Sequence, residues 1–252
     1  MLTVLHAPAA ADSIEVATAT APDPFDVQTD AGRERLEHLY RPPHADWLRI
    51  NLIVSVPGSA AGTDGTSESL TNRTDRRILG VIRRHADLVL VGAASVRAEG
   101  YRIPATTTLG VVTGSGDLSG HRIEEGESSR LTVFCPASAT GRVSATMPGC
   151  TIVEVADLDG RLSAADLLAA ARGTGARSIV CEGGPSLAAQ LAAINAVDEV
   201  CLTTAPMLTG TTLPSLGAAA FAPVPLRPTL LMTDENGALY SRWQRSTPHP
   251  AP

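Results

Sequence analysis

The sequence predicts an α/β protein whose central sheet is mixed but mainly parallel, flanked by helices and completed by a C-terminal antiparallel hairpin. Two observations favour this fold. Short apolar runs alternate with helical stretches between residues 47 and 204. Towards the C-terminus, two strand-like runs, 229–233 and 239–245, are separated by Asn236-Gly237, a dipeptide typical of a tight hairpin turn. No internal boundary interrupts this pattern, so we expect residues 29–252 to form one domain.

The remaining elements can be assigned in chain order. Residues 1–28 are rich in Ala, Thr, Pro and Asp and are interpreted as a mobile leader. Asp30 is expected to cap a helix that ends at Tyr40, because two prolines follow. Strands are expected at 47–54, 87–91, 109–113, 131–135, 151–155, 178–181 and 197–204, and helices at 72–85, after 92–95, at 163–172 and at 186–194, with polar loops at 55–71 and 114–130.

Composition narrows the chemistry. Aromatic residues make up only 3% of the chain, so the core must be aliphatic. All 20 basic residues are Arg, which excludes reactions that require Lys, and the net charge is −6. Any phosphate must therefore be held by Arg, hydroxyl or backbone N–H groups. Because there is no basic stripe and no membrane-spanning apolar run, we expect a cytoplasmic protein with neither nucleic acid nor membrane as partner.

Cysteine and histidine give no sign of a metal site. The four Cys residues show no CxxC spacing and no His at ligand distance, so we expect structural thiols rather than zinc ligands. None of the six His residues follows a predicted strand directly, where catalytic groups of α/β proteins usually lie. The cysteines are Cys135, Cys150, Cys181 and Cys201.

Three strand ends could hold a phosphorylated ligand. In SIVCEGGPSL, Gly183 and Gly184 separate a buried strand from a helix whose N-terminal N–H groups attract anions. In LVLVGAASV, Gly92 and Ser95 form a second such turn, and in VVTGSG two hydroxyls follow a third strand. Each could equally be an ordinary packed turn, and none has the GxGxxG spacing of a dinucleotide fingerprint.

Taken in order, these segments resemble one family. The series WLRINLIVSVPG, GTSES, DRRILGVIRRHADLVLVGAASVRAEGY, VVTGSG, CEGGPSLAAQL and VDEVCLTTAPMLTG is similar to the reductase domain of the riboflavin-biosynthesis deaminase-reductase, the RibD C-terminal family, and especially to its stand-alone actinobacterial members. The resemblance runs from about Trp47 to the C-terminus. It implies a dihydrofolate-reductase-like fold, a homodimer, and NADPH as hydride donor, with NADH as the other option.

The resemblance also assigns roles to individual residues. A substrate site is implied at the end of the first long strand, and a cofactor site along the ends of the next ones. Substrate contacts are implied for Asn51, Ser55 and Pro57, and cofactor contacts for Gly92, Ser95, Thr113, Ser115, Gly183, Gly184, Ser186, Leu187, Pro206, Leu208 and Gly210.

Two positions depart from the family pattern. Where the family has S-L-D-G, this chain has Ser55-Val56-Pro57-Gly58, so Pro57 replaces a carboxylate. Asp64 and Glu68 on the following loop are the candidates to supply that carboxylate for catalysis. Related members often carry Arg at the position of Gly114, where it can pair with the 2′-phosphate of NADPH.

Three functions remain open at this point. The first is a nicotinamide-dependent reductase acting on a C=N bond of a pyrimidine, pterin or related small heterocycle. The second is a repurposed enzyme that uses the same cleft for a non-redox biosynthetic step. The third is a binding protein whose active site has lapsed. Pro57 and Gly114 are the residues that keep the last two open.

Overall fold

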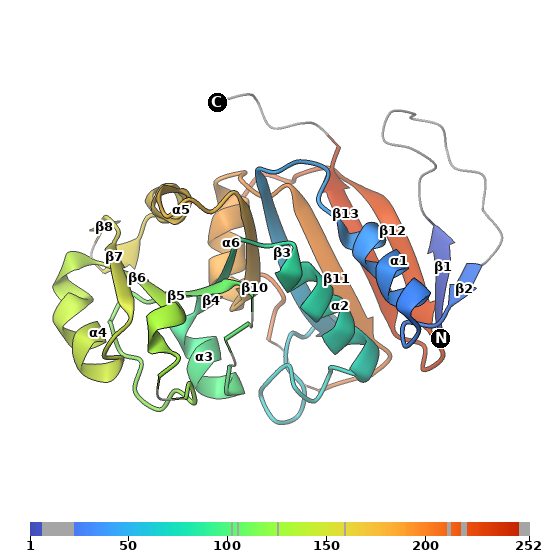
Figure 1. The fold of residues 1–252 in the computed structure, drawn as a ribbon, viewed down its shortest axis with the longest axis horizontal. Coiled ribbons are helices and arrows are strands. Elements are labelled where there is room, and N and C mark those ends of the chain that lie inside the picture. Colours follow the sequence, from blue (N-terminus) through green and yellow to red (C-terminus); the bar gives the residue numbers. More distant parts are fainter. Residues whose placement is uncertain are drawn as a thin grey trace.

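The computed structural model describes residues 1–6, 23–101, 103–104, 106–124, 126–158, 160–210, 213–217 and 221–246. Its main feature is one mixed sheet, in which the strands lie in the order β2-β1-β12-β13-β11-β3-β10-β4-β5-β6-β7 (Figure 1). The strands of this sheet are β1 (Leu2–His6), β2 (Asp23–Phe25), β3 (Trp47–Ser55), β4 (Leu88–Gly92), β5 (Thr108–Val112), β6 (Leu131–Cys135), β7 (Thr151–Glu154), β10 (Ser178–Gly183), β11 (Glu199–Ala205), β12 (Leu226–Asp234) and β13 (Leu239–Arg245).

The pairing confirms the expected fold class. Every neighbouring pair from β11 to β7 is parallel. The hairpin of β12 and β13 adds to β11 in the antiparallel direction, with Gly237 at positive φ in its turn. The helices that flank the sheet are α1 (Asp30–Tyr40), α2 (Arg73–Arg84), α3 (Ala93–Glu99), α4 (Thr140–Thr146), α5 (Ala164–Gly173) and α6 (Pro185–Ala193).

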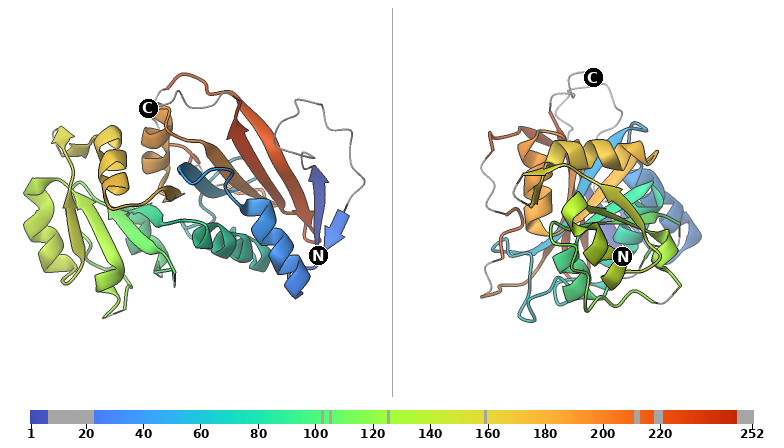
Figure 2. Two further views of the ribbon diagram at one scale, coloured as in Figure 1. Left: turned by 45° about the horizontal axis from the view of Figure 1, so that its top comes forward. Right: turned by 90° about the vertical axis from the view of Figure 1, so that its left-hand side faces the viewer.

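Alternating side chains on the strands place helices on both faces. On β4, Leu88 and Leu90 pack in the cluster of α5 and α6, whereas Val89 and Val91 pack in that of α3 and α4. Val180 of β10 lies in register with Val89 and packs under α1 and α2. Helices α1 to α4 therefore cover one face, and α5 and α6 cover the other (Figure 2). The core is aliphatic apart from a few aromatic side chains, as the composition predicts.

The prediction of a mobile leader is wrong at both of its ends. β1 pairs with β12 and with β2, so residues 2–6 and 23–25 belong to the sheet. The physical reason is the alternation in LTVLH, which buries Leu2 and Val4 beneath α1 and α2. The prediction of a leader rests on the composition of residues 1–28 and does not take this short alternation into account. Residues 7–22 lie outside the described part of the chain.

The helix boundaries follow from caps. Thr29, not Asp30, is the N-cap of α1, and its side chain accepts a hydrogen bond from the Gly32 N–H. Asn72 caps α2 and Ser163 caps α5 in the same way, and the cap at Ser163 agrees with the helix start expected there. Sequence analysis missed α4 and the small hairpin of β8 (Asp157–Leu158) and β9 (Arg161–Leu162), which are too short to show a clear period. Two further short helical turns are η1 (Ser128–Arg130) and η2 (Ala137–Ala139).

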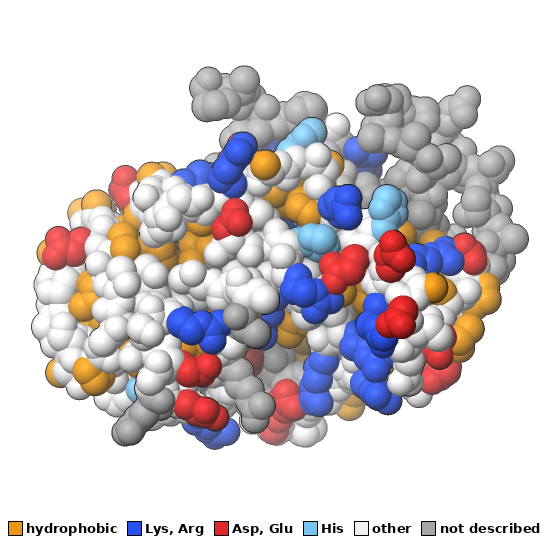
Figure 3. Space-filling model, viewed as in Figure 1, with side chains coloured by type: hydrophobic (Ala, Val, Ile, Leu, Met, Phe, Trp, Pro, Cys, Tyr) orange, Lys and Arg blue, Asp and Glu red, His pale blue; other side chains and the backbone are white. Residues whose placement is uncertain are grey.

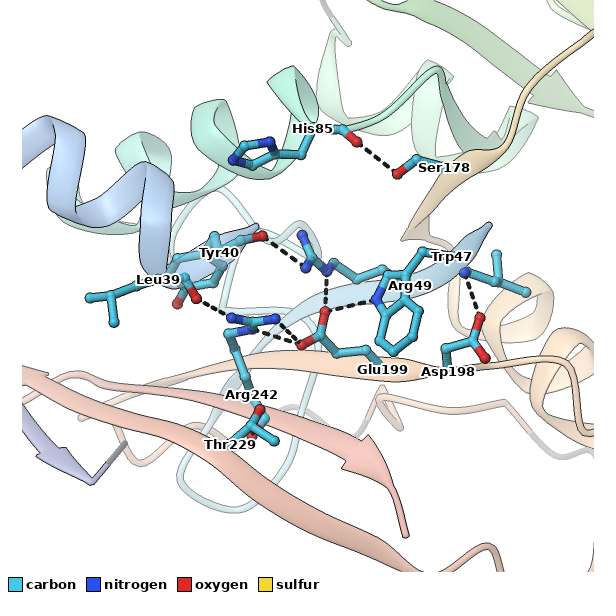
Figure 4. Close-up of polar contacts among 11 residues, drawn as sticks. Leu39, Tyr40, Trp47, Arg49, His85, Ser178, Asp198, Glu199, Thr229 and Arg242 are labelled. Carbon is cyan, nitrogen blue, oxygen red and sulfur yellow. Dashed lines mark hydrogen bonds and ion pairs between the residues drawn. The ribbon is translucent and has the colours of Figure 1, made fainter. Parts of the chain in front are cut away.

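A buried ion network joins α1 to the middle of the sheet (Figure 4). Glu199 of β11 is fully buried and pairs with Arg49 of β3 and with Arg242 of β13, whose Nε lies 2.7 Å from Glu199 Oε1. Arg49 Nη2 donates to the Tyr40 carbonyl at 2.9 Å, and Arg242 donates to the Leu39 carbonyl. The two guanidinium groups thereby satisfy carbonyls at the C-terminus of α1, where positive charge is favoured.

All four cysteines are free thiols. Cys135, Cys181 and Cys201 are buried in strands, and Cys150 is half-buried. Burial raises the pKa of Cys181 and of Cys201 to about 12, so both stay protonated at neutral pH. This agrees with the structural role expected for them. Within the described ranges, none of the helices has the length and apolar character of a membrane span.

Candidate functional site

The parallel strands end together at one edge of the sheet. The C-terminal ends of β11, β3, β10, β4 and β5 are neighbours there, and ligands of parallel α/β sheets bind at this edge. The predicted site residues come from the segments that follow these five strands. We call the ends of β10, β4 and β5 the first half of this edge, and the ends of β3 and β11 its second half.

Two glycine turns meet in the first half. A Cβ added to Gly92 would lie 3.6 Å from the Gly184 nitrogen, and one added to Gly184 would lie 3.3 Å from Ser95 Oγ. The turn after β10 therefore rests directly on the turn after β4. A cis peptide bond joins Gly183 and Gly184, and Gly183 has φ +142. The structure thus brings together the four residues that sequence analysis placed in two separate turns.

Glu182, which precedes Gly183, anchors this pair of turns to neighbouring side chains. Its carboxylate is buried and receives two hydrogen bonds from Arg83 of α2, at 2.7 and 2.6 Å, and one from the Tyr101 hydroxyl. The Arg83 guanidinium also lies 5.2 Å from the centre of the Tyr101 ring. Burial, together with the Glu182 carboxylate, raises the pKa of Tyr101 far above its usual value. Sequence analysis had no signal for this contact, since Arg83 is 99 residues away from Glu182.

The loop after β5 is held by its own hydroxyls. Thr113 Oγ1 accepts from the Gly116 N–H at 3.0 Å, and the exposed Ser115 Oγ accepts from the Asp117 N–H at 3.3 Å. A Cβ on Gly114 would lie 2.5 Å from the Gly160 carbonyl oxygen, so an Arg cannot occupy this position without moving the β8–β9 turn. The absence of an Arg guanidinium at position 114 therefore has a steric cause.

Another guanidinium reaches the same loop from α4. Arg142 Nη2 lies 2.9 Å from Asp117 Oδ2, and the Asp117 backbone carbonyl accepts from Arg97 Nη1 at 2.5 Å. The Ser119 N–H, with Arg142 as a further contribution, holds the pKa of Asp117 below its usual value. Arg142 is exposed, and within the described ranges its one ion pair is with this surface carboxylate, so it is available to an anionic ligand.

In the second half, Ser55 joins the ends of β3 and β11. Its hydroxyl is fully buried and accepts from Thr209 Oγ1 at 2.9 Å, while Val56 N donates to the Met207 carbonyl at 3.0 Å. Pro57 lies exposed in a tight turn that the Gly58 N–H closes on the Ser55 carbonyl at 2.8 Å. Pro57 thus shapes the turn and offers neither a carboxylate nor an N–H.

The other predicted residues are spread around this edge. Pro206, Leu208 and Gly210 are exposed on the loop after β11, and Leu208 is 88% exposed. Ser186 is exposed in the first turn of α6, where Gly217 packs against it. Leu187 is buried in the core with its N–H donated to Gly184, so its side chain serves packing.

The two predicted catalytic carboxylates have other partners. Asp64 is exposed and accepts from the hydroxyls of Ser69 and Thr66 at 2.7 Å, and these bonds lower its pKa. Glu68 is exposed and pairs with Arg76 of α2. Both therefore organise the loop before α2. Nearby, desolvation, with added repulsion from the Glu182 and Glu68 carboxylates, raises the pKa of Glu99.

A carboxyl that sequence analysis missed lies at the end of β11. Asp75, in the first turn of α2, accepts from Thr203 Oγ1 and from Thr71 Oγ1, both at 2.6 Å. Desolvation raises its pKa above the usual value, against the effect of these two hydrogen bonds. A carboxyl that stays protonated to higher pH, at the edge where ligands bind, is a candidate for proton transfer.

The sequence does contain a signal for Asp75, but it has a more common explanation. Asn72 and Asp75 have the spacing of a helix capping box, and the Asp75 N–H does donate to Asn72 Oδ1 at 2.8 Å. Only the tertiary contact with Thr203, 128 residues away, shows that the carboxyl serves another purpose. Asn51 lies on the same face of the sheet, half-buried and in register with Cys201.

A mixed sheet whose parallel strands end in paired glycine turns defines an α/β protein of the kind in which ligands bind at the carboxyl edge. The family model of the RibD C-terminal domain matches residues 46–239. The chain therefore belongs to the RibD C-terminal domain family, as the sequence resemblance indicated. β1, β2 and α1 lie before the matched range. A search among curated proteins gave no match.

Solved structures show the same fold. A pyrimidine reductase-like protein of Corynebacterium diphtheriae has 21% identity and a TM-score of 0.69, over 84% of this chain and 99% of the other. The riboflavin biosynthesis reductase Rib7 of Saccharomyces cerevisiae has 11% identity and a TM-score of 0.62, over 86% and 100%.

A bifunctional protein of Thermotoga maritima, a diaminohydroxyphosphoribosylaminopyrimidine deaminase/5-amino-6-(5-phosphoribosylamino)uracil reductase, has 16% identity and a TM-score of 0.63. The match covers 79% of this chain but only 56% of that protein. At these identities the likeness shows the fold alone.

Proposed function

We propose that this chain is a nicotinamide-nucleotide-dependent reductase that delivers hydride to the carbon of a C=N bond in a pyrimidine, pterin or related heterocycle. The observation that carries the proposal is the meeting of the β10 and β4 glycine turns at the sheet edge near which Asp75 of α2, a carboxyl of raised pKa, bonds to Thr203 of β11. The names of the relatives, a pyrimidine reductase-like protein and a riboflavin biosynthesis reductase, support it.

The residues present fit a dinucleotide. Gly92 and Gly184 carry no side chain where the two turns approach each other, so backbone N–H groups and Ser95 can contact a pyrophosphate. Arg142 and the hydroxyl of Ser115 are placed for the adenosine end. NADPH is therefore the donor that we propose, and NADH is the alternative. When bound, the nicotinamide supplies the hydride.

The order of the strands relates the proposed proton donor to this cradle. Thr203, which donates to Asp75, is level with Ile53 of β3, and β3 separates β11 from β10. Two strand spacings, about 10 Å, therefore lie between β11 and the strand that ends at Gly183. Asp75 would hold a proton for the C=N nitrogen while the adjacent carbon receives hydride.

The geometry also bears on the repurposed or lapsed alternatives. Those alternatives depend on Pro57, which removes a carboxylate from the family motif. Asp75 offers a carboxyl from α2 instead, with two hydroxyl donors to orient it. This favours a working reductase over a lapsed site. The homodimer and the identity of the heterocycle stay predictions.

The cradle can be tested by filling it. Gly184→Val is expected to weaken NADPH binding by at least about tenfold, since the added side chain would occupy the space next to Ser95. Isothermal calorimetry measures the affinity. Gly173→Val, at the open end of α5 where a Cβ meets nothing within 4 Å, is the matched control and should leave it unchanged. If the wild-type protein binds neither NADPH nor NADH saturably, the proposed function is wrong.

Arg142 should decide between the two cofactors. Loss of one charge-assisted contact costs about 1.5–3 kcal/mol, so Arg142→Gln is expected to weaken NADPH binding about tenfold or more and leave NADH unaffected. Arg227→Gln, which removes an exposed Arg on β12, is the control. A wild-type protein that binds both cofactors equally would contradict this assignment.

A further inference from the structure

A groove rich in arginine lies between α1 and α2. It encloses about 250 Å³ and opens on the helical face, where arginine side chains gather over α1 and α2 (Figure 3). Four of its lining residues are basic and the other four are apolar. They are Arg33, Arg76, Arg77, Arg84, Val27, Leu36, Gly80 and Val81.

The charge of this groove is opposite to that of the whole chain. The chain carries a net charge of −6, yet among the described residues no carboxylate lines the groove. Asp30, Glu68 and Glu37 each pair with one of the arginines from outside the lining. The arginine of each pair is more than half exposed, and such surface pairs contribute only about 0–1 kcal/mol. These three arginines can therefore turn towards an anion in the groove at little cost.

Arg77 is the most available of the four. In the described part of the chain it forms no ion pair, and its only hydrogen bond is a long one of 3.5 Å to the neutral Gln28 side chain. The residue is half-buried, and no carboxylate of the described residues pairs with its guanidinium. A bidentate oxyanion such as a phosphate would supply that partner.

The floor of the groove adds a second preference. Val27, Leu36 and Val81 form an apolar base, and Gly80 leaves it open because a Cβ there would meet only the Arg84 side chain, at 3.6 Å. We propose that this groove is a second binding site, which takes an organic phosphate with its phosphoryl group against Arg77 and its apolar part against this base. None of its lining residues is among those assigned above to the cofactor or the substrate, so this site is distinct from that of the proposed reductase.

The groove is also connected to the reductase loop. Arg76 lines the groove and pairs with Glu68, which belongs to the loop where Ser67 donates to Glu99. An anion that draws Arg76 into the groove would release Glu68. Occupation of the groove would therefore loosen the loop beside the proposed substrate site.

The experiment uses phenyl phosphate and inorganic phosphate as probes, with calorimetry at low salt. We expect saturable binding of phenyl phosphate, at least about fivefold tighter than inorganic phosphate because of the apolar base. Arg77→Gln should weaken it about tenfold. Arg73→Gln removes the same charge from the same helix outside the groove and should change it less than about twofold.

A second variant keeps the charges and blocks the space. Gly80→Leu fills the floor with a good helix former and should also weaken binding about tenfold. The proposal is overturned by any of three results: no saturable binding to the wild-type protein, equal losses in Arg73→Gln and Arg77→Gln, or displacement of phenyl phosphate by NADPH. None of these results depends on whether the chain is a reductase.

Discussion

Glu199→Gln is expected to lower the free energy of unfolding by about 3–5 kcal/mol. Glu199 is 0% exposed and is the only carboxylate between two buried guanidinium groups, Arg49 and Arg242, in the described chain. The substitution keeps the size of the side chain but leaves two like charges buried without compensation. Urea denaturation at pH 7 measures the loss. The pair of Glu127 with Arg130 lies at the surface, with side chains 36% and 39% exposed, so Glu127→Gln is the control and should cost less than about 1 kcal/mol.

The same network predicts a pH dependence. Burial alone would raise the pKa of Glu199, but Arg49 and Arg242 hold it below its usual value. The unfolded chain therefore takes up this proton more readily than the folded one. The stabilising contribution is present above about pH 4.3 and is lost as the pH falls through the lower pKa of the folded state. Glu199→Gln should show a flatter stability profile than the wild type below about pH 5, and an unchanged profile would contradict the role of the network.

Asp75→Asn is expected to lower kcat for NADPH oxidation by about 10²-fold or more. The amide keeps the hydrogen bonds of the carboxyl to Thr203 and Thr71 approximately in place but cannot release a proton. KM for the cofactor should stay unchanged, because Asp75 lies on the β11 side of the edge. Dihydrofolate and the ribosylamino-pyrimidine phosphate are the substrates to assay, by loss of absorbance at 340 nm.

Asp64→Asn and Glu68→Gln are the matched controls for Asp75. Both carboxylates are exposed and bonded within or beside their own loop, so each change should lower kcat by less than about threefold. The raised pKa of Asp75 adds a second readout, since the limb of the pH–rate profile that reports this carboxyl should disappear in Asp75→Asn alone. A larger loss in Asp64→Asn would return the catalytic role to the loop.

The central fold was predictable because its signals are local. β3, β4, β5, β6 and β10 are buried apolar runs bounded by turn residues, and the Asn236-Gly237 turn marks the hairpin. The parts that were missed depend on tertiary context. β1 is a five-residue alternation that becomes a strand only against β12, and α4 is a seven-residue helix without a side-chain cap.

The candidate site likewise has parts with a local sequence signal and parts that depend on tertiary contacts. Glycine turns can be located from the sequence, since Gly92 and Gly183 end buried strands and Gly184 follows directly. Hydrogen-bond partners cannot be located in this way, because Glu182 bonds to Arg83 and Asp75 to Thr203 across 99 and 128 residues of sequence. Gly114 is a further example, because only the folded structure shows that the Gly160 carbonyl leaves no room for a side chain there.

The position of β10 has a consequence for the order of folding. β10 lies between β3 and β4, yet it follows them in the chain by 123 and 86 residues. Before β10 inserts, these two strands have unpaired edges facing each other, and such long-range parallel pairing is slow. The Gly183–Gly184 turn reaches Gly92 only through that insertion. Closure of the core and assembly of the proposed cofactor cradle are thus one event, and a partly folded chain would have no cradle.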